Sequence, residues 1–251
     1  MNDYERQMYQ ILGAVSSTDA PIVFKGALIT KLVLAENGFH SLERHTADID
    51  ANWVGAPPSM DELAGVINRS LAALDCGLTA VAVREYAEKR SAGLSIVSTA
   101  TGGDVISMDI SVKPVVGSRV YHYGDVSISG VLPTEILADK ISVISSKMIF
   151  RRTKDFVDVY ALARCVSVNT TEIYGVTKNK GRVIGSFTEF RGRRDDVAHA
   201  YERLAGIEGK PPFDEVYSYV ERFVEPFANN DAMRRVWNCD KSVWEDATAL
   251  Q

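Results

Sequence analysis

The chain has 251 residues, 46% of them hydrophobic and 24% charged, with a formal net charge of −5, which is typical of a globular protein with one or two domains. It contains no run of 18 apolar residues and no signal-peptide pattern, so we expect a cytoplasmic protein without a membrane partner. The three cysteines are widely spaced, which argues against a disulfide framework and against a zinc site.

A glycine turn is the first feature with chemical interest. Residues 21–24 predict a short strand, which runs into Lys25-Gly26 and then into a helix, because apolar side chains follow at helical spacing. A small residue at the start of a helix lets backbone N–H groups approach a phosphate. The alternative is that Gly26 only eases a tight turn.

Two carboxylates follow about twenty residues later, in the segment from Arg44 to Asp50. On a strand, Asp48 and Asp50 project from the same face while Ile49 turns into the core. Like charges on one face repel unless a cation lies between them, and Mg²⁺ prefers such oxygen ligands. The alternative is a solvated edge strand with two acids that bind nothing.

A third carboxylate lies on a predicted β-hairpin. Residues 95–99 and 105–112 are rich in β-branched side chains, and Gly102-Gly103 supplies the turn between them. Asp109 points away from the apolar face of the second arm. If this arm pairs beside the strand of Asp48 and Asp50, three acids converge, as they do around two metal ions about 3.5–4 Å apart in phosphoryl-transfer sites. Without the first acid pair, Asp109 would be better explained as a polar residue on the solvent-exposed face of a hairpin.

Helical patterns dominate after residue 130. Pro133 predicts a helix start, and Lys140 lies beside the apolar stripe of that helix, where its ammonium could simply reach back to water. A basic run, Arg151 to Lys154, precedes Asp155 and Asp158, and Asp155 can balance the charge of a first helical turn.

Residues 178–194 contain six basic and one acidic side chain, a net charge of +5. This strip predicts either a surface that neutralises RNA phosphates or a solvated loop between helices. The change in pattern near residue 130 predicts an α/β domain over 1–130 and a mainly helical domain over 131–251.

Three of these motifs, with two further segments, resemble the polymerase-β-like nucleotidyltransferases, and most closely the AbiEii/AbiGii toxins. The matching segments are Lys25-Gly26-Ala27-Leu28, the R-x-T-x-D-x-D run from Arg44 to Asp50, Asp109, residues 135–140 and residues 151–160. The resemblance covers about residues 22 to 165, and we expect it to continue through residues 190–196. The R-x-T-x-D-x-D run is the specific motif, and the others support it.

The resemblance implies an α+β fold with a nucleotidyltransferase-like mixed sheet flanked by helices, plus a C-terminal helical domain. It implies that Asp48, Asp50 and Asp109 hold Mg²⁺ or Mn²⁺, and that catalysis also involves Lys140 and Asp158. It further implies that Lys25, Gly26 and Lys140 contact the NTP. The expected activity is transfer of a nucleotide from the NTP to an RNA, such as tRNA, or to a protein hydroxyl. A cognate antitoxin is the expected protein partner.

The chain departs from the family at the glycine turn, where Gly26-Ala27-Leu28 replaces the usual Gly-Gly followed by Ser or Thr. Thr30 is the nearest hydroxyl that could take the missing role. This departure leaves open a non-catalytic descendant that binds a nucleotide or a partner protein. A third hypothesis is a metal-dependent nuclease, because three acids with two metals also hydrolyse phosphodiesters.

Overall fold

The computed structural model describes residues 3–85, 91–229, 231 and 234–247. The chain forms two compact units. Unit 1 comprises the described residues of Met1–Leu32 and Thr46–Leu132, and unit 2 those of Val33–His45 and Pro133–Gln251. Among the described helices, none is long and apolar enough to cross a membrane. The division into a nucleotidyltransferase α/β domain over residues 1–130 and a mainly helical domain over residues 131–251 stays a prediction.

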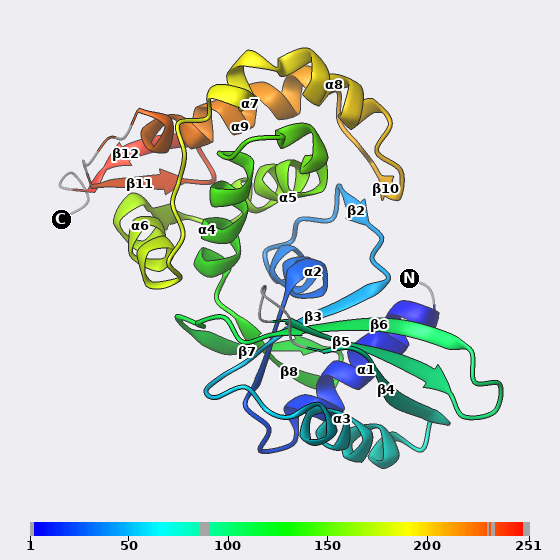
Figure 1. Ribbon diagram of the computed structural model, residues 1–251. Helices are drawn as coiled ribbons and strands as arrows, with labels where there is room; N and C mark the ends of the chain where they lie inside the picture. Colours follow the sequence, from blue (N-terminus) through cyan, green and yellow to red (C-terminus); the bar gives the residue numbers. More distant parts are fainter. Residues whose placement is uncertain (1–2, 86–90, 230, 232–233, 248–251) are drawn as a thin grey trace. The chain divides into compact units, whose positions relative to one another are not determined.

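Unit 1 is built on a seven-stranded mixed sheet in the order β4-β5-β6-β3-β1-β8-β7 (Figure 1). The pairs β3–β6 and β1–β8 are parallel, and the other neighbours are antiparallel. The strands are β1 (Ile22–Lys25), β3 (Asp48–Trp53), β4 (Leu78–Arg84), β5 (Ser91–Ser98), β6 (Asp104–Ser111), β7 (Ser118–Tyr123) and β8 (Val126–Val131). The expected mixed sheet is therefore confirmed.

Helices α1 (Asp3–Ser16) and α3 (Met60–Leu74) lie side by side on one face of this sheet (Figure 1). The alternation of β3 and β6 explains which face they cover, because Ile49, Ile106, Met108 and Ile110 are fully buried or nearly so. Ser59 caps α3 by accepting a hydrogen bond from the backbone N–H of Glu62. The polar side chains of the same two strands therefore project from the opposite face.

Helix α2 (Gly26–Glu36) begins in unit 1, directly after β1, and ends in unit 2. Its start at Gly26 confirms the predicted change from strand to helix. The predicted hairpin is also confirmed, because β5 and β6 pair antiparallel around a turn in which Gly102 adopts a φ of +68°.

Unit 2 is mainly helical. Its helices are α4 (Pro133–Ile144), the 3₁₀ turn η1 (Ile149–Arg151), α5 (Thr153–Ala163), α6 (Thr170–Asn179), α7 (Thr188–Gly192), α8 (Arg194–Glu202) and α9 (Phe213–Ala228). Its short strands are β2 (Glu43–Arg44), β9 (Val168–Asn169), β10 (Ile207–Glu208), β11 (Arg235–Asn238) and β12 (Val243–Asp246). They form a two-stranded sheet, β10-β2, and a three-stranded sheet, β12-β11-β9.

Aromatic side chains hold this unit together. Phe156 on α5 packs against Phe190, Tyr201 and Phe213, with ring centroids 6.0–6.3 Å apart. Trp237 on β11 is fully buried and donates its indole N–H to the carbonyl oxygen of Ala163 over 2.6 Å. This core fixes α5, which carries the acidic residues of the second polar centre described below.

Candidate functional site

A row of charged side chains crosses the open face of the unit 1 sheet. Strand register places Lys25 of β1 beside Asp50 of β3, Asp50 beside Asp109 of β6, Asp109 beside Gly93 of β5, and Gly93 beside Arg84 of β4. Paired residues in neighbouring strands share a face, so the two carboxylates of the row lie between two cations. The expected convergence of the hairpin acid with the acid strand is thus confirmed at the level of the backbone.

Arg84 contacts Asp109 across β5, where the residue between them is Gly93, which has no side chain. Its guanidinium hydrogen-bonds to a carboxylate oxygen of Asp109. Between them lies Gly93, and a Cβ there would be 3.3 Å from the Cβ of Arg84 and 3.4 Å from its Cζ. Both charged side chains are about half exposed, at 52% and 46%, so water screens the pair. Sequence reasoning missed Arg84, because only the register of β4, β5 and β6 brings it to Asp109.

The donor chemistry of Asp48, Asp50 and Asp109 suits Mg²⁺ or Mn²⁺, since all three supply hard carboxylate oxygens. Asp48 and Asp50 are two residues apart on β3, and Asp50 is level with Asp109. In the side-chain positions of the described residues, however, no group of three or more His, Cys, Asp or Glu side chains gathers closely enough to hold a metal. One carboxylate oxygen of Asp109 is instead bound by Arg84.

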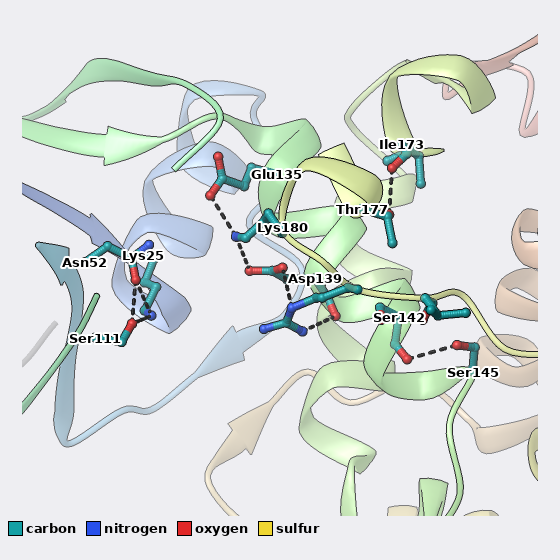
Figure 2. A network of polar contacts seen from close by, with 12 residues as sticks. Lys25, Asn52, Ser111, Glu135, Asp139, Ser142, Ser145, Ile173, Thr177 and Lys180 are labelled. Atoms are coloured by element: carbon teal, nitrogen blue, oxygen red, sulfur yellow. Dashed lines mark hydrogen bonds and ion pairs between the residues drawn. The ribbon is translucent and has the colours of Figure 1, made fainter. Parts of the chain in front are cut away.

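Lys25 belongs to a polar cluster on the same face (Figure 2). Its ammonium donates to Asn52 Oδ1 over 2.7 Å and to Ser111 Oγ over 2.6 Å. Ser111 donates to the same oxygen of Asn52, and the amide nitrogen of Asn52 is buried with no hydrogen-bond partner among the described residues. The cluster fixes Lys25 against β3 and β6, beside the acids. Its predicted contact with an NTP stays a prediction.

Gly26 has a second reason to be glycine besides its position at a helix start. It adopts a φ of +72°, and a Cβ there would lie 2.3 Å from Asp50 Oδ2. The absence of a side chain therefore leaves room for the Asp50 carboxylate. Thr30 does not replace the missing hydroxyl of the family motif, because it is 2% exposed and donates to the carbonyl oxygen of Gly26 over 2.9 Å.

A second polar centre lies inside unit 2. Lys140 of α4 is 8% exposed, and its ammonium contacts Asp158 Oδ2 at 2.5 Å and Asp155 Oδ1 at 3.1 Å. Arg44 of β2 hydrogen-bonds to the same oxygen of Asp158. Burial alone lowers the pKa of Lys140, but the carboxylates of Asp158 and Asp155 outweigh it, so the pKa is raised above the usual lysine value.

This centre overturns one interpretation of the sequence. The ammonium of Lys140 does not reach back to water; two carboxylates hold it inside the unit. Asp155 lies in the first turn of α5, as expected for a helix-start acid, and it binds Lys140 as well. The roles assigned to Lys140 and Asp158 in catalysis, and to Lys140 in NTP contact, stay predictions.

The basic strip over residues 178–194 is largely neutralised within unit 2. The side chain of Lys180 is 3% exposed, and its ammonium contacts Glu135 and Asp139 at 2.7 Å each. Figure 2 shows these contacts. Arg182 also pairs with Asp139, at 3.2 Å. Arg193 and Arg194 pair with acids of α7, α8 and α9. The net charge of +5 counted along the sequence therefore does not form a free positive surface.

Comparison with known proteins places these residues in a family. The family model for the nucleotidyl transferase AbiEii toxin of a type IV toxin–antitoxin system matches residues 10–237. The chain belongs to that family. The match includes all three carboxylates, the glycine turn and the Lys140–Asp158 centre of this AbiEii protein.

Solved structures and curated proteins add little to this assignment. The nucleotidyltransferase toxin MenT4 from Mycobacterium tuberculosis is 16% identical, with a TM-score of 0.45 and 90% of each chain covered. An antigenic nucleotidyltransferase-like protein from Paracoccidioides brasiliensis is 12% identical, with a TM-score of 0.45 and 79% of this chain and 92% of that chain covered. Among curated proteins, no relative matches. Membership of the family rests on the match over residues 10–237 alone.

Proposed function

We propose that this AbiEii protein is a metal-dependent toxin that transfers a nucleotide from an NTP to a hydroxyl group of an RNA such as tRNA. An acceptor hydroxyl on a protein is the less favoured form of the same reaction. The observation that carries the proposal is the pairing of Asp50 with Asp109 on the open face of the sheet, with Asp48 two residues away. Two adjacent carboxylates and a third nearby favour a bound divalent cation.

Each acid has a distinct place in the proposed reaction. Asp48 and Asp50 would hold Mg²⁺ or Mn²⁺ together with the triphosphate, and the metal would neutralise phosphate charge when bound. Asp109 would face the attacking hydroxyl and accept its proton. The hydroxyl oxygen then bonds to the α-phosphorus as the bond to the β-phosphate breaks, and pyrophosphate leaves. Gly26 would leave the start of α2 open to a phosphate, where backbone N–H groups favour anions.

Membership of a toxin family in a type IV toxin–antitoxin system supports two further parts of the proposal. The toxin would use an NTP as its substrate, and a separate antitoxin would relieve its effect in the cell.

Incubation with each radiolabelled NTP, Mg²⁺ and total tRNA tests the reaction. Wild-type protein should lengthen and label the RNA and release pyrophosphate, whereas Asp48→Asn, which keeps the size of the side chain but removes its charge, should not. Asp75→Asn is the matched control, because Asp75 is an acid of the same unit at the C-cap of α3, away from the acid strands. Equal or absent labelling by wild type and Asp48→Asn would remove the proposed activity for these acceptors. Shortened RNA would identify a nuclease instead.

A non-catalytic descendant that binds a nucleotide or a partner protein is the second candidate. Two observations favour it. Arg84 occupies the carboxylate that would bind a metal, Asp109. The glycine turn also lacks the hydroxyl that would face the triphosphate, and the hydroxyl of Thr30 is bonded to the Gly26 carbonyl oxygen instead. Calorimetry with each NTP and Mg²⁺ distinguishes the two. Binding with no pyrophosphate release from any acceptor would support the second candidate.

A further inference from the structure

Unit 2 contains a cavity of about 570 Å³ with a strongly basic lining. Arg44 of β2, Arg151 of η1, Arg152 and Lys154 at the start of α5, and Arg203 at the end of α8 all line it, and we call it the basic pocket. Asp155 is the one acid in the lining. Five cations against one carboxylate predict a site for a polyanion.

Two of the five cations of the basic pocket have acidic partners, Arg44 with Asp158 and Arg152 with Asp155, and the other three do not. Among the residues that the structure describes, no ion pair forms at Arg151, Lys154 or Arg203, and all three side chains are exposed. Asp155 is already contacted by Lys140 at 3.1 Å and by Arg152 at 3.8 Å. In the strip over residues 178–194, by contrast, most of the cations have acidic partners. The free positive charge of this region therefore lies in the pocket.

Two further features suit phosphate groups in particular. Helix α5 begins at the pocket without a side-chain cap, so the donors of its first turn remain available to an anion. Four of the five cations are arginines, whose planar guanidinium matches a phosphate with two parallel hydrogen bonds. The Nε of Arg44 is buried and has no partner within the described part of the chain, although its Nη1 binds Asp158.

We propose that the basic pocket binds the backbone phosphates of a single-stranded RNA segment, which is the acceptor of the transfer reaction. Five cations line the pocket and three of them are exposed and without an ion pair among the described residues, which suits the repeated phosphates of an RNA strand; binding of a free NTP is an outcome that the experiment separates. The statement that this RNA is the acceptor rests on the proposed function. The binding of RNA to the pocket can be measured without NTP or metal.

Fluorescence anisotropy with a 5′-fluorescein-labelled 12-nucleotide single-stranded RNA, in EDTA and without NTP, tests the proposal on the full-length chain. The variant Arg151→Gln/Lys154→Gln/Arg203→Gln removes three exposed cations. Each phosphate contact contributes about −0.7 to the slope of log K against log salt concentration. At 0.1 M salt, loss of one contact therefore weakens binding about fivefold. The triple variant should therefore bind on the order of a hundredfold more weakly, with the salt slope reduced by about 2.

Arg222→Gln is the matched control, because Arg222 is an exposed cation on α9 of the same unit and does not line the pocket. It should bind RNA like the wild type. Circular dichroism of each variant checks that the fold is intact. The proposal is overturned if wild type does not bind this RNA, if the triple variant keeps the wild-type affinity and slope, or if Arg222→Gln weakens binding equally.

Asp48→Asn separates this inference from the proposed function. It should bind the labelled RNA like the wild type while it fails to transfer a nucleotide. If the wild type transfers no nucleotide but the triple variant still loses RNA binding, the pocket stands and the transferase proposal falls. If the triple variant instead loses ATP binding in calorimetry and keeps RNA binding, the pocket is a nucleotide site and the inference is wrong.

Discussion

Gly26→Ala tests whether the glycine turn exists to make room for the Asp50 carboxylate. The substitution forces an alanine into a φ of +72°, which costs about 1 kcal/mol. Its Cβ would also lie 2.3 Å from Asp50 Oδ2 and 2.9 Å from both Cβ and Cγ of Asp50, and relief of such overlap costs about 1–3 kcal/mol. We expect the free energy of unfolding to fall by about 2–4 kcal/mol in total.

Gly102→Ala is the matched control, because Gly102 has a φ of +68° in the same unit and nothing lies within 4 Å of a Cβ there. It should lose only the backbone cost of about 1 kcal/mol in urea unfolding followed by circular dichroism. In an Asp50→Ala background, the cost of Gly26→Ala should shrink by about 1–2 kcal/mol, since only the Cβ of residue 50 remains in contact. Equal losses at the two glycines, or no change in that background, would refute the steric explanation.

The ion pairs Arg84–Asp109 and Lys140–Asp158 give further predictions. Arg84→Met removes the cation from Asp109. Because an exposed pair contributes about 0.2–1 kcal/mol, Mn²⁺ should bind about 1.4-fold to fivefold more tightly in calorimetry. An unchanged or weaker affinity would show that Arg84 does not compete with the metal. Lys140→Met leaves Asp158 with Arg44 as its remaining cation and should lower the free energy of unfolding by about 3–5 kcal/mol in urea, whereas a loss below about 1 kcal/mol would contradict the buried pairing. The pKa of Lys140 is raised in the folded state, so its stabilising contribution should be full below the unfolded pKa of about 10.4 and be lost as the pH rises through the higher folded value. The difference in unfolding free energy between wild type and Lys140→Met should therefore be constant from about pH 7 to 9.5 and shrink above about pH 10.5. A difference that already shrinks between about pH 9.5 and 7 would refute the assignment.

Local patterns were sufficient to predict the elements that carry the candidate site. Alternation of apolar and polar residues predicts β3 and the β5–β6 hairpin, and Gly26 marks the start of α2. Pro133, the predicted helix start, is the first residue of α4. These features depend on neighbours within a few residues, so a single sequence contains the information.

The partners of the charged residues depend on tertiary structure and could not be predicted in the same way. Arg84 reaches Asp109 only because Gly93 lies level with both. Lys180 looked like part of a basic surface, yet Glu135 lies 45 positions earlier in the chain and contacts its ammonium. A count of charges over neighbouring positions cannot predict such partners, because the neutralising acid lies on another helix. The same limit applies to Lys140, because its place beside the apolar stripe did not indicate the two acidic partners on α5 that hold its ammonium inside the unit.

The parallel pairing of β3 with β6 has a consequence for how the protein matures. Asp50 and Asp109 are brought level by strands that no tight turn joins, since α3, β4 and β5 intervene along the chain. Helices and hairpins form from nearby residues and form early, whereas a contact over such a long loop pays its closure entropy first and forms late. In a growing polypeptide, Asp50 and Asp109 therefore cannot come level until β6 has left the ribosome and docked beside β3.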